Sequence, residues 1–363
     1  MADLAKIRVK DDEAIRVDWR RLQDFIARCY VAVGVDPKAA LEAAEVSVSA
    51  DLRGVDTHGV SNAPRNNYVP GMKNGTINPR PDFRIVKETP NSAVVDGDNS
   101  LGFIAGRYGM NLAIKKAKER TVGVVTVRNS RHYGSAGFYA MMARKEGLLG
   151  ISMTNAGPGV VPTFGREGRF GTNPIAVAVP AGKENYWMLD MATSTVAANK
   201  VALAARLGMP IPEGWVADKE GNPVTDPKTA RESRLMLPLG GTPSGSSYKG
   251  YGLAVWVDIM CGVLAGGGFG MRMTPRHVGH FFAAINIADF IPLNEFEERM
   301  EQLLGDLKST PPAAGYDRVY YAGEQEQAIE AERLANGIPL HISVINEFRD
   351  MAQELGVTYD LTE

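Results

Sequence analysis

The run Gly123-Val124-Val125-Thr126-Val127 and the polar loop after it, Asn129-Ser130-Arg131-His132-Tyr133-Gly134, set the pattern that decides the fold class. Short runs of β-branched and apolar residues bounded by glycine loops are typical of strands rather than helices. The pattern recurs along the middle of the chain, at Leu148 to Met153, Pro174 to Val179, Tyr186 to Met191 and Arg234 to Leu237. Helical periodicity is sparse between these runs, so the sequence predicts an antiparallel or mixed sheet instead of a doubly wound parallel one.

A hairpin and a helix are predicted just before this region. Phe83 to Lys87 and Ala93 to Asp96 read as two strands joined at Thr89-Pro90-Asn91, and Ile104 to Arg120 reads as a helix. Cations are favoured near a helix C-terminus, so the basic last turn of that helix is interpreted as a solvent-facing surface. Its residues are Lys115, Lys116, Lys118 and Arg120.

Both ends of the chain have the spacing of amphipathic helices. Asp36-Pro37 supplies an N-cap and an N1 proline, and an apolar stripe follows as far as Leu52, with Gly54 as the stop. Tyr251 to Leu264 is a strongly apolar helix candidate, and the segment after Leu293 and Ile342 to Leu355 are predicted helices. Helical ends around a β-rich middle predict one lobe built from both termini, with a sheet lobe inserted between them.

Composition limits the class of protein. The 363 residues include 44% hydrophobic and 23% charged residues, with a net charge of −2, so the basic surplus of a nucleic-acid-binding protein is absent. No run of 18 apolar residues occurs and Met1 to Lys10 lacks an apolar stretch, so we expect a cytoplasmic protein without a membrane span or secretory signal. Cys29 and Cys261 lie in apolar segments and are expected to be buried free thiols.

Histidine is the natural proton donor or acceptor near neutral pH, and two of the five histidines lie in glycine-flanked polar loops. These are His58, in Asp56-Thr57-His58-Gly59, and His132, in the loop quoted above. A lone loop histidine is more often a surface residue, but two such loops make an active-site pair an equal alternative. His280 precedes an apolar run, and a hydrogen-bonded core histidine is favoured there over a substrate-facing one.

Several site types are missing from the sequence. There is no GxxxxGK[ST] loop, no HExxH and no GxSxG, and the glycine run Gly266 to Gly270 follows a helix, whereas the dinucleotide fingerprint follows a strand. The histidines lie far apart, with no carboxylate at metal-ligand spacing. The sequence therefore predicts an acid/base enzyme without a metal, in which a cofactor supplies the difficult chemistry.

Over nearly its whole length, the chain resembles the malate/L-lactate dehydrogenase family of the non-Rossmann type. That family includes ureidoglycolate, sulfolactate and diketogulonate dehydrogenases and cyclic-imine carboxylate reductases. Six segments in order carry the resemblance: 50–60 (ADLRGVDTHGV), 132–139 (HYGSAGFY), 171–176 (GTNPIA), 189–194 (LDMATS), 248–254 (YKGYGLA) and 321–324 (YAGE), with a closing Arg333 to Ile338.

The resemblance implies an α/β fold of α+β-like organisation, with a largely antiparallel sheet domain, not a Rossmann domain, that binds NAD or NADP. It implies a helical lobe for substrate binding and dimerisation (residues 1–121 and 293–363), a cofactor-binding β-rich domain (residues 122–292), and a homodimer. His132 would be the catalytic acid/base and His58 a second active-site imidazole. The cofactor would be held by Thr172, Asn173, Asp190, Met191, Ala192, Lys249, Gly323 and Glu324.

The substrate expected from the resemblance is a small 2-hydroxy or 2-oxo acid. The residues expected to face it are Asn62, Arg65, Tyr68 and His280. Many members of the family have an arginine where this chain has Asn62, and an asparagine supplies neither the charge nor the two-pronged hydrogen bonding of a carboxylate clamp. Either Arg65, three residues on, substitutes for that arginine, or the substrate differs from that of those members.

Two alternatives remain open. The same two histidines would serve a reductase of cyclic or N-alkyl imino acids, which acts on C=N instead of C=O. A ligand-binding protein that kept the fold and lost catalysis is a different class, and the presence of both His58 and His132 argues against it. Neither the choice between NAD and NADP nor the identity of the acid follows from the sequence.

Overall fold

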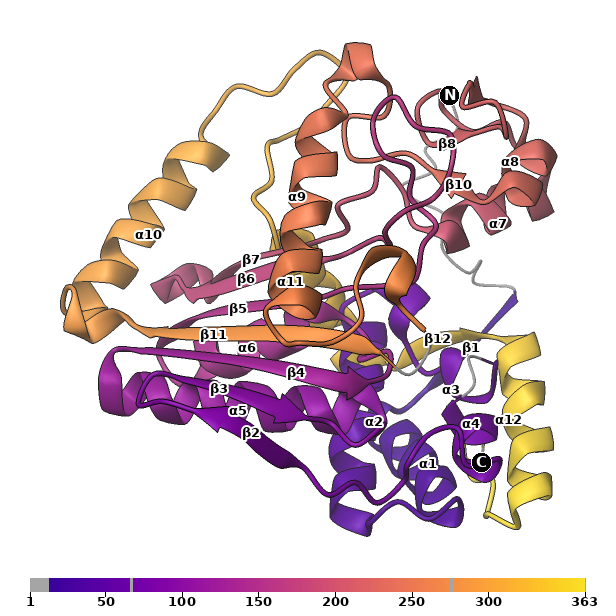
Figure 1. The fold of residues 1–363 in the computed structure, drawn as a ribbon, viewed down its shortest axis with the longest axis vertical. Coiled ribbons are helices and arrows are strands. Elements are labelled where there is room, and N and C mark those ends of the chain that lie inside the picture. Colours follow the sequence, from indigo (N-terminus) through magenta and orange to yellow (C-terminus); the bar gives the residue numbers. More distant parts are fainter. Residues whose placement is uncertain (1–12, 66–67, 275–276, 363) are drawn as a thin grey trace.

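A seven-stranded sheet forms the centre of the computed structural model, which describes residues 13–65, 68–274 and 277–362 (Figure 1). The pairing of β3 with β4 is parallel, and every other neighbouring pair is antiparallel, as the sequence predicted for the fold class. In sheet order the strands are β2 (Arg84–Glu88), β3 (Ser92–Asp96), β4 (Val122–Ser130), β11 (Val278–Asn286), β5 (Leu148–Thr154), β6 (Ile175–Pro180) and β7 (Tyr186–Met191).

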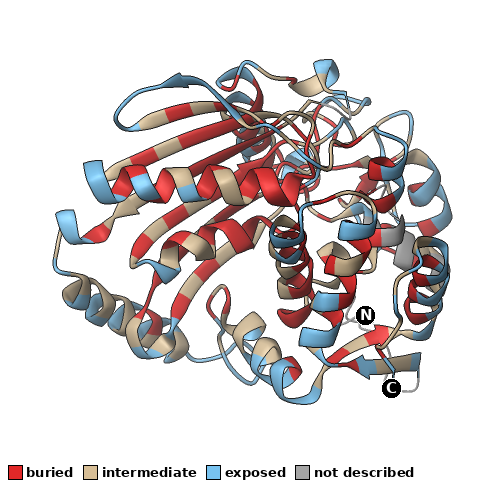
Figure 2. Cartoon of the chain, turned by 90° about the horizontal axis from the view of Figure 1, so that it is seen from below, coloured by how far each residue is buried: buried red, intermediate tan, exposed pale blue. Residues whose placement is uncertain are grey.

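Helices cover both faces of this sheet. The helices α5 (Gly102–Arg120) and α6 (Ala136–Lys145) pack on one face, with their buried residues turned toward the strands (Figure 2). On the other face, α9 (Tyr248–Asp258) and a π-helical turn after it (Ile259–Val263) bury Val257 and Cys261 against strand side chains. Cys261 and Cys29 are both buried free thiols, as expected.

The two ends of the chain meet in one lobe. The short strands β1 (Ala14–Val17) and β12 (Ile338–His341) pair antiparallel, which ties the N-terminal segment to the C-terminal one. Around this pair lie the helices α1 (Trp19–Ala32), α2 (Pro37–Leu52), α3 (Asn62–Arg65), α4 (Tyr68–Lys73), α11 (Glu324–Asn336) and α12 (Ile342–Leu355). The predicted start of α2 is confirmed, since the Asp36 side chain accepts from the Lys38 and Ala39 backbone N–H groups and Pro37 is the first helical residue.

A small lobe and a long connection complete the chain. Three two-residue strands, β8 (Val216–Ala217), β9 (Pro223–Val224) and β10 (Leu235–Met236), form a second sheet beside α7 (Ala198–Leu207) and α8 (Pro227–Ser233). The charged helix α10 (Leu293–Lys308) packs near the outer edge of the main sheet. None of the helices in the described ranges combines the length and the apolarity that crossing a lipid bilayer requires.

The structure differs from the sequence expectation at the last turn of α5. The basic turn of α5 is not uniformly solvated, because Lys116 is only 6% exposed and forms a 2.7 Å ion pair with Glu88, on the hairpin folded over it.

The division of the chain into two domains at residue 121 stays a prediction. The hydrogen-bonded sheet runs across that point, because β2 and β3 precede it and β4 follows it.

Candidate active site

The His58 loop follows the C-terminus of α2 as a single 3₁₀ turn, Asp56–His58. Asp51, in the last turn of α2, accepts a 2.7 Å hydrogen bond from the backbone N–H of Val60. A Cβ at Gly59 would lie 1.8 Å from the Asp51 carboxylate, so only glycine fits there. Within the turn, the Thr57 hydroxyl lies 2.9 Å from His58 Nδ1 and fixes the orientation of the imidazole.

An arginine from α11 holds the same loop from the other side. The side chain of Arg333, 3% exposed, pairs with the Asp56 carboxylate at 2.5 Å and also donates to the backbone carbonyl of Asp51. Burial raises the pKa of Asp51, with the nearby Asp56 adding to the shift. The sequence predicted no role for the contacts among Asp51, Asp56 and Arg333, although Arg333 begins the last segment that resembles the family.

His132 lies in the loop after β4 and faces His58. The two imidazole rings stack, with centroids 5.7 Å apart and planes 19° from parallel. The Tyr68 hydroxyl contacts His132 Nδ1, and the backbone N–H of Gly134 donates to the same atom at 3.3 Å. Because the Gly134 N–H is a donor only, this hydrogen bond assigns the proton of the neutral ring to Nε2.

Both imidazoles are held neutral near pH 7. Burial lowers the pKa of His58, and the Asp190 carboxylate partly offsets that shift. For His132, the surrounding protein atoms lower the pKa most, and the neighbouring His58 lowers it further. The His132 residue is nevertheless exposed to solvent, and water offsets part of this lowering of its pKa.

Asp190, at the end of β7, caps the N-terminus of α6. Its Oδ2 accepts from the Ser135 hydroxyl at 2.7 Å and from the backbone N–H of Gly137 at 2.8 Å. A Cβ at Gly137 would come within 2.7 Å of this oxygen, so glycine permits the close approach. The negative charge at this helix N-terminus is therefore the protein's own carboxylate, which is favourable with respect to the helix dipole.

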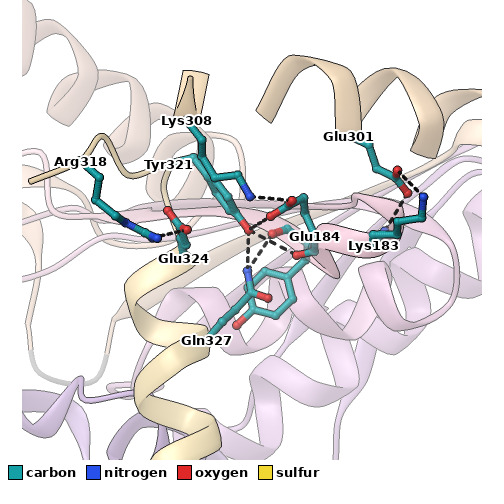
Figure 3. A network of polar contacts seen from close by, with 9 residues as sticks. Lys183, Glu184, Glu301, Lys308, Arg318, Tyr321, Glu324 and Gln327 are labelled. Atoms are coloured by element: carbon teal, nitrogen blue, oxygen red, sulfur yellow. Dashed lines mark hydrogen bonds and ion pairs between the residues drawn. The ribbon is translucent and has the colours of Figure 1, made fainter. Parts of the chain in front are cut away.

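A cavity of about 600 Å³ opens beside these groups. One wall comes from the His58 loop and the start of α6, a second from the end of β7, and a third from the turn Tyr320 to Gly323 before α11. Tyr321 anchors this third wall by donating to Glu184, which also pairs with Lys308 at 2.6 Å, while Gln327 donates to the backbone of Tyr186 (Figure 3).

The candidate cofactor residues fall into two groups. Thr172, Asp190, Met191, Ala192 and Gly323 line this cavity. The other three candidates, Asn173, Lys249 and Glu324, are not among its lining residues.

The three remaining candidates, Asn173, Lys249 and Glu324, lie in different surroundings. Asn173 is fully buried, accepting from the Ala156 N–H at 3.0 Å and donating to the Ala254 carbonyl at 2.9 Å. Lys249 is exposed in the first turn of α9, and Glu324 pairs with Arg318 (Figure 3).

The candidate substrate residues are likewise not all together. Tyr68 contacts His132, as described above. Asn62 turns back and donates to the Thr57 carbonyl at 2.8 Å, and the Arg65 side chain lies outside the described part of the structure. His280 is fully buried on β11, with Thr154 and Ser130 hydroxyls 2.8 and 2.9 Å from its two ring nitrogens and the Tyr133 ring stacked on it at 4.5 Å.

One lining residue was not singled out from the sequence. Arg53, between α2 and the His58 loop, is among the residues that line the cavity. Its only signal was its place inside the motif 50–60. No three histidine, cysteine, aspartate or glutamate side chains come together as metal ligands in the described residues.

Comparison with known proteins agrees with this architecture. Residues 17–349 match the family model described as malate/L-lactate dehydrogenase. The chain is 43% identical to a malate dehydrogenase of Pyrococcus horikoshii over 96% of this chain and 97% of that protein. It is 39% identical to an L-sulfolactate dehydrogenase of Methanocaldococcus jannaschii, over 90% and 93%.

Solved structures share the whole fold. The crystal structure of malate dehydrogenase from Entamoeba histolytica superposes with a TM-score of 0.92 at 35% identity, covering 96% of this chain and all of that one. The structure of a Δ1-piperideine-2-carboxylate reductase from Pseudomonas syringae gives 0.81 at 26% identity, over 93% and 100%. The chain therefore belongs to the malate/L-lactate dehydrogenase family of oxidoreductases.

Proposed function

We propose that this enzyme transfers hydride between NAD(P) and a small 2-hydroxy or 2-oxo acid, with His132 as the acid/base. The observation that carries the proposal is the stacked pair of neutral imidazoles, His58 and His132, beside a cavity lined by five of the eight expected cofactor residues. Hydride transfer to a carbonyl develops an alkoxide, and a positioned imidazole is well suited to protonate it. Cytoplasmic location is part of the same proposal.

The cavity fits a nicotinamide cofactor. Its volume of about 600 Å³ and its mixture of apolar and polar walls are those of a cofactor site. Gly323 has a φ of 94°, and a Cβ there would come within 3.1 Å of the Met188 backbone, so the Ala322–Gly323 turn packs directly on β7. Thr172, Asp190, Met191, Ala192 and Gly323 would hold the cofactor, whose nicotinamide supplies or accepts the hydride.

The proton is handled at Nε2 of His132. With Nδ1 accepting from Gly134, the resting neutral ring carries its proton on Nε2. Uptake of a second proton at Nδ1 lets Nε2 donate its proton to the developing alkoxide and leaves the ring neutral. In the oxidative direction the steps reverse: Nε2 accepts the hydroxyl proton when the ring carries its own proton on Nδ1, where the Tyr68 hydroxyl can change from donor to acceptor. His58, held by Thr57, keeps a second neutral imidazole against the reacting groups and disfavours a lasting charge on His132.

Reduction of a cyclic imino acid is the second candidate. The favouring observation is the likeness of the whole chain to the piperideine-carboxylate reductase structure. A C=N substrate also needs one hydride and one proton, so the same two histidines would serve. The differences between the two functions lie in the substrate, not in the residues that move the proton.

A substrate panel tests both candidates. Pyruvate, oxaloacetate and a cyclic imino acid are each mixed with NADH and with NADPH, and the absorbance of the reduced cofactor is followed. Turnover of the 2-oxo acids supports the first proposal, and turnover of the imino acid alone supports the second. Saturable cofactor binding without turnover of any of them would indicate a binding protein and overturn both.

A homodimer is also part of the proposal. Along α9 and the turn after it, no charged residue occurs between Lys249 and Asp258, and one side stays uncovered. A helix that is apolar all round is expected to be buried, and exposed apolar patches mark interaction surfaces. The residues of this patch, from 37% to 53% exposed, are Leu253, Trp256, Ile259, Val263 and Leu264.

A further inference from the structure

Arg53 is a buried arginine whose charge the described structure leaves unpaired. Its residue surface is only 4% exposed, and its Nε and Nη2 atoms are enclosed without a hydrogen-bond partner. The neighbouring hydroxyl of Tyr186 is also enclosed, and burial raises its pKa although the Arg53 charge and a contact with the Arg53 side chain lower it in part. The guanidinium therefore has a neutral hydroxyl beside it and no ion pair with a carboxylate among the described residues.

Such an arrangement is costly for folding. A buried charge that is neither paired nor hydrogen-bonded destabilises the folded state, and buried donors without partners are rare in native proteins. A guanidinium kept in this condition therefore needs an explanation outside the stability of the fold. Charged groups in unfavourable surroundings are common at functional sites, where a bound ligand supplies the missing partner.

The position of Arg53 indicates what kind of ligand it awaits. Arg53 lines the 600 Å³ cavity together with His58, which lies five positions further along the same segment. Among the described lining residues, Asp190 and Glu326 bring negative charge and Arg53 is the single permanent cation. Asn62, at the position of the expected carboxylate clamp, is turned to the Thr57 carbonyl instead.

The geometry of the free donors matches an oxyanion. Nε and Nη2 lie on one edge of the guanidinium plane, and this edge makes the two parallel hydrogen bonds of a bidentate pair with a carboxylate. Since both atoms are enclosed, an anion meets them after the guanidinium rotates toward the cavity that Arg53 borders.

We propose that Arg53 binds an oxyanion in this cavity, and that in the proposed reaction this group is the carboxylate of the acid substrate. The inference rests on the proposed function and deepens it. A phosphate of the cofactor has the same chemistry, so the experiment measures the two separately.

The experiment compares wild type with Arg53→Met and Arg53→Lys. Lys145→Met is the control, because Lys145 lines a second cavity that Arg53 also borders but not the first one. Three quantities are measured: Tm without ligand, the dissociation constant of NADH by fluorescence, and the dissociation constant of oxalate in the presence of NADH. A matching Arg65→Ala variant tests the carboxylate clamp expected from the sequence.

For Arg53→Met we expect oxalate to bind roughly 10- to 100-fold more weakly, the effect of a lost charged hydrogen bond. NADH affinity should change less than about twofold, and Tm should stay equal or rise, because an unpaired buried charge is removed. Arg53→Lys should recover part of the oxalate affinity, and the control should match wild type. Weakening of NADH binding instead of oxalate binding supports the oxyanion site and assigns it to a cofactor phosphate.

Two results would overturn the inference. Unchanged affinities together with a lowered Tm would show that Arg53 stabilises the fold, for instance through the glutamates of α11. Loss of oxalate binding in Arg65→Ala but not in Arg53→Met would place the clamp at Arg65. Failure of the proposed function looks different, because wild type itself would then bind neither NADH nor oxalate.

Discussion

His58 and His132 stack with their ring centroids 5.7 Å apart, although one belongs to the loop after α2 and the other to the loop after β4. The surrounding protein lowers the pKa of both rings, and His58 lowers that of His132 further. Only His132 has its Nδ1 hydrogen-bonded to a backbone donor and in contact with Tyr68. This asymmetry suggests that the two rings differ in role, with His132 exchanging the proton and His58 shaping the site.

The first prediction concerns these roles. His132→Ala should lower kcat by roughly 100- to 10,000-fold, the usual range for one general acid–base group. NADH affinity, measured by fluorescence, should hardly change, because the candidate cofactor residues lie on other segments. His58→Ala is the matched comparison and should also slow the reaction. If His132→Ala keeps more than about a tenth of wild-type kcat while His58→Ala is inactive, the two roles are exchanged.

The second prediction concerns pH. Oxidation of the hydroxy acid needs a neutral His132, so activity is complete above its pKa and is lost as pH falls through it. Since the surrounding protein atoms and His58 lower this pKa below 6.5, the acidic limb of kcat/KM should lie below pH 6.5. Tyr68→Phe should move that limb, because it removes a hydrogen bond to Nδ1. An acidic limb above pH 7 in wild type would contradict the assignment.

The sheet was predictable because local composition dictates it. Runs such as Leu148–Thr154 and Tyr186–Met191 are short, apolar and bounded by turns, and the strands begin and end where these runs do. By contrast, β1 and β12 have four residues each and form only because the chain ends meet. Helix α11 was also missed, since it lacks an apolar stripe and its buried residue is the charged Arg333.

The site was predictable only where motif residues are themselves functional candidates. His58, His132 and Asp190 stand in recognisable segments, and the structure brings them to one cavity or its edge. The contacts that hold these residues in place could not be predicted, because the partners lie far apart in the sequence. Arg333, which pairs with Asp56, lies 277 residues away from it. The unpaired state of Arg53 is likewise a product of packing, which no local pattern encodes.

The third prediction concerns metals. The described residues include no cluster of metal ligands, and the proposed chemistry needs none. Turnover should therefore be unchanged after incubation with a strong chelator and dialysis. Loss of activity that returns on addition of a divalent metal would refute the metal-free mechanism.

The fourth prediction concerns assembly. Light scattering at micromolar concentration should report twice the chain mass of 39.2 kDa. Trp256→Glu, which places a charge in the exposed apolar patch of α9, should shift the protein toward the monomer. Leu303→Glu is the control, since Leu303 is similarly exposed at 52% but lies on α10, away from the patch. A wild-type monomer would contradict the homodimer, and a dimer of Trp256→Glu would place the interface elsewhere.

The last prediction concerns His280 and acid stability. Burial and, to a smaller extent, His132 lower the pKa of His280 to about 3, whereas the same side chain in the unfolded chain titrates near its ordinary value of 6.5. A histidine with a lowered pKa in the folded state contributes its full stability above pH 6.5 and loses it as pH falls toward 3. Over that window each such group removes about 1.4 kcal/mol of unfolding free energy per pH unit. His280→Gln should therefore unfold with a shallower dependence on pH, even if it is less stable at pH 7. His277→Gln, which makes the same change at a partly exposed imidazole, is the control. Urea titrations at several pH values measure the slope, and equal slopes for wild type and His280→Gln would show that His280 is not the group that takes up the proton.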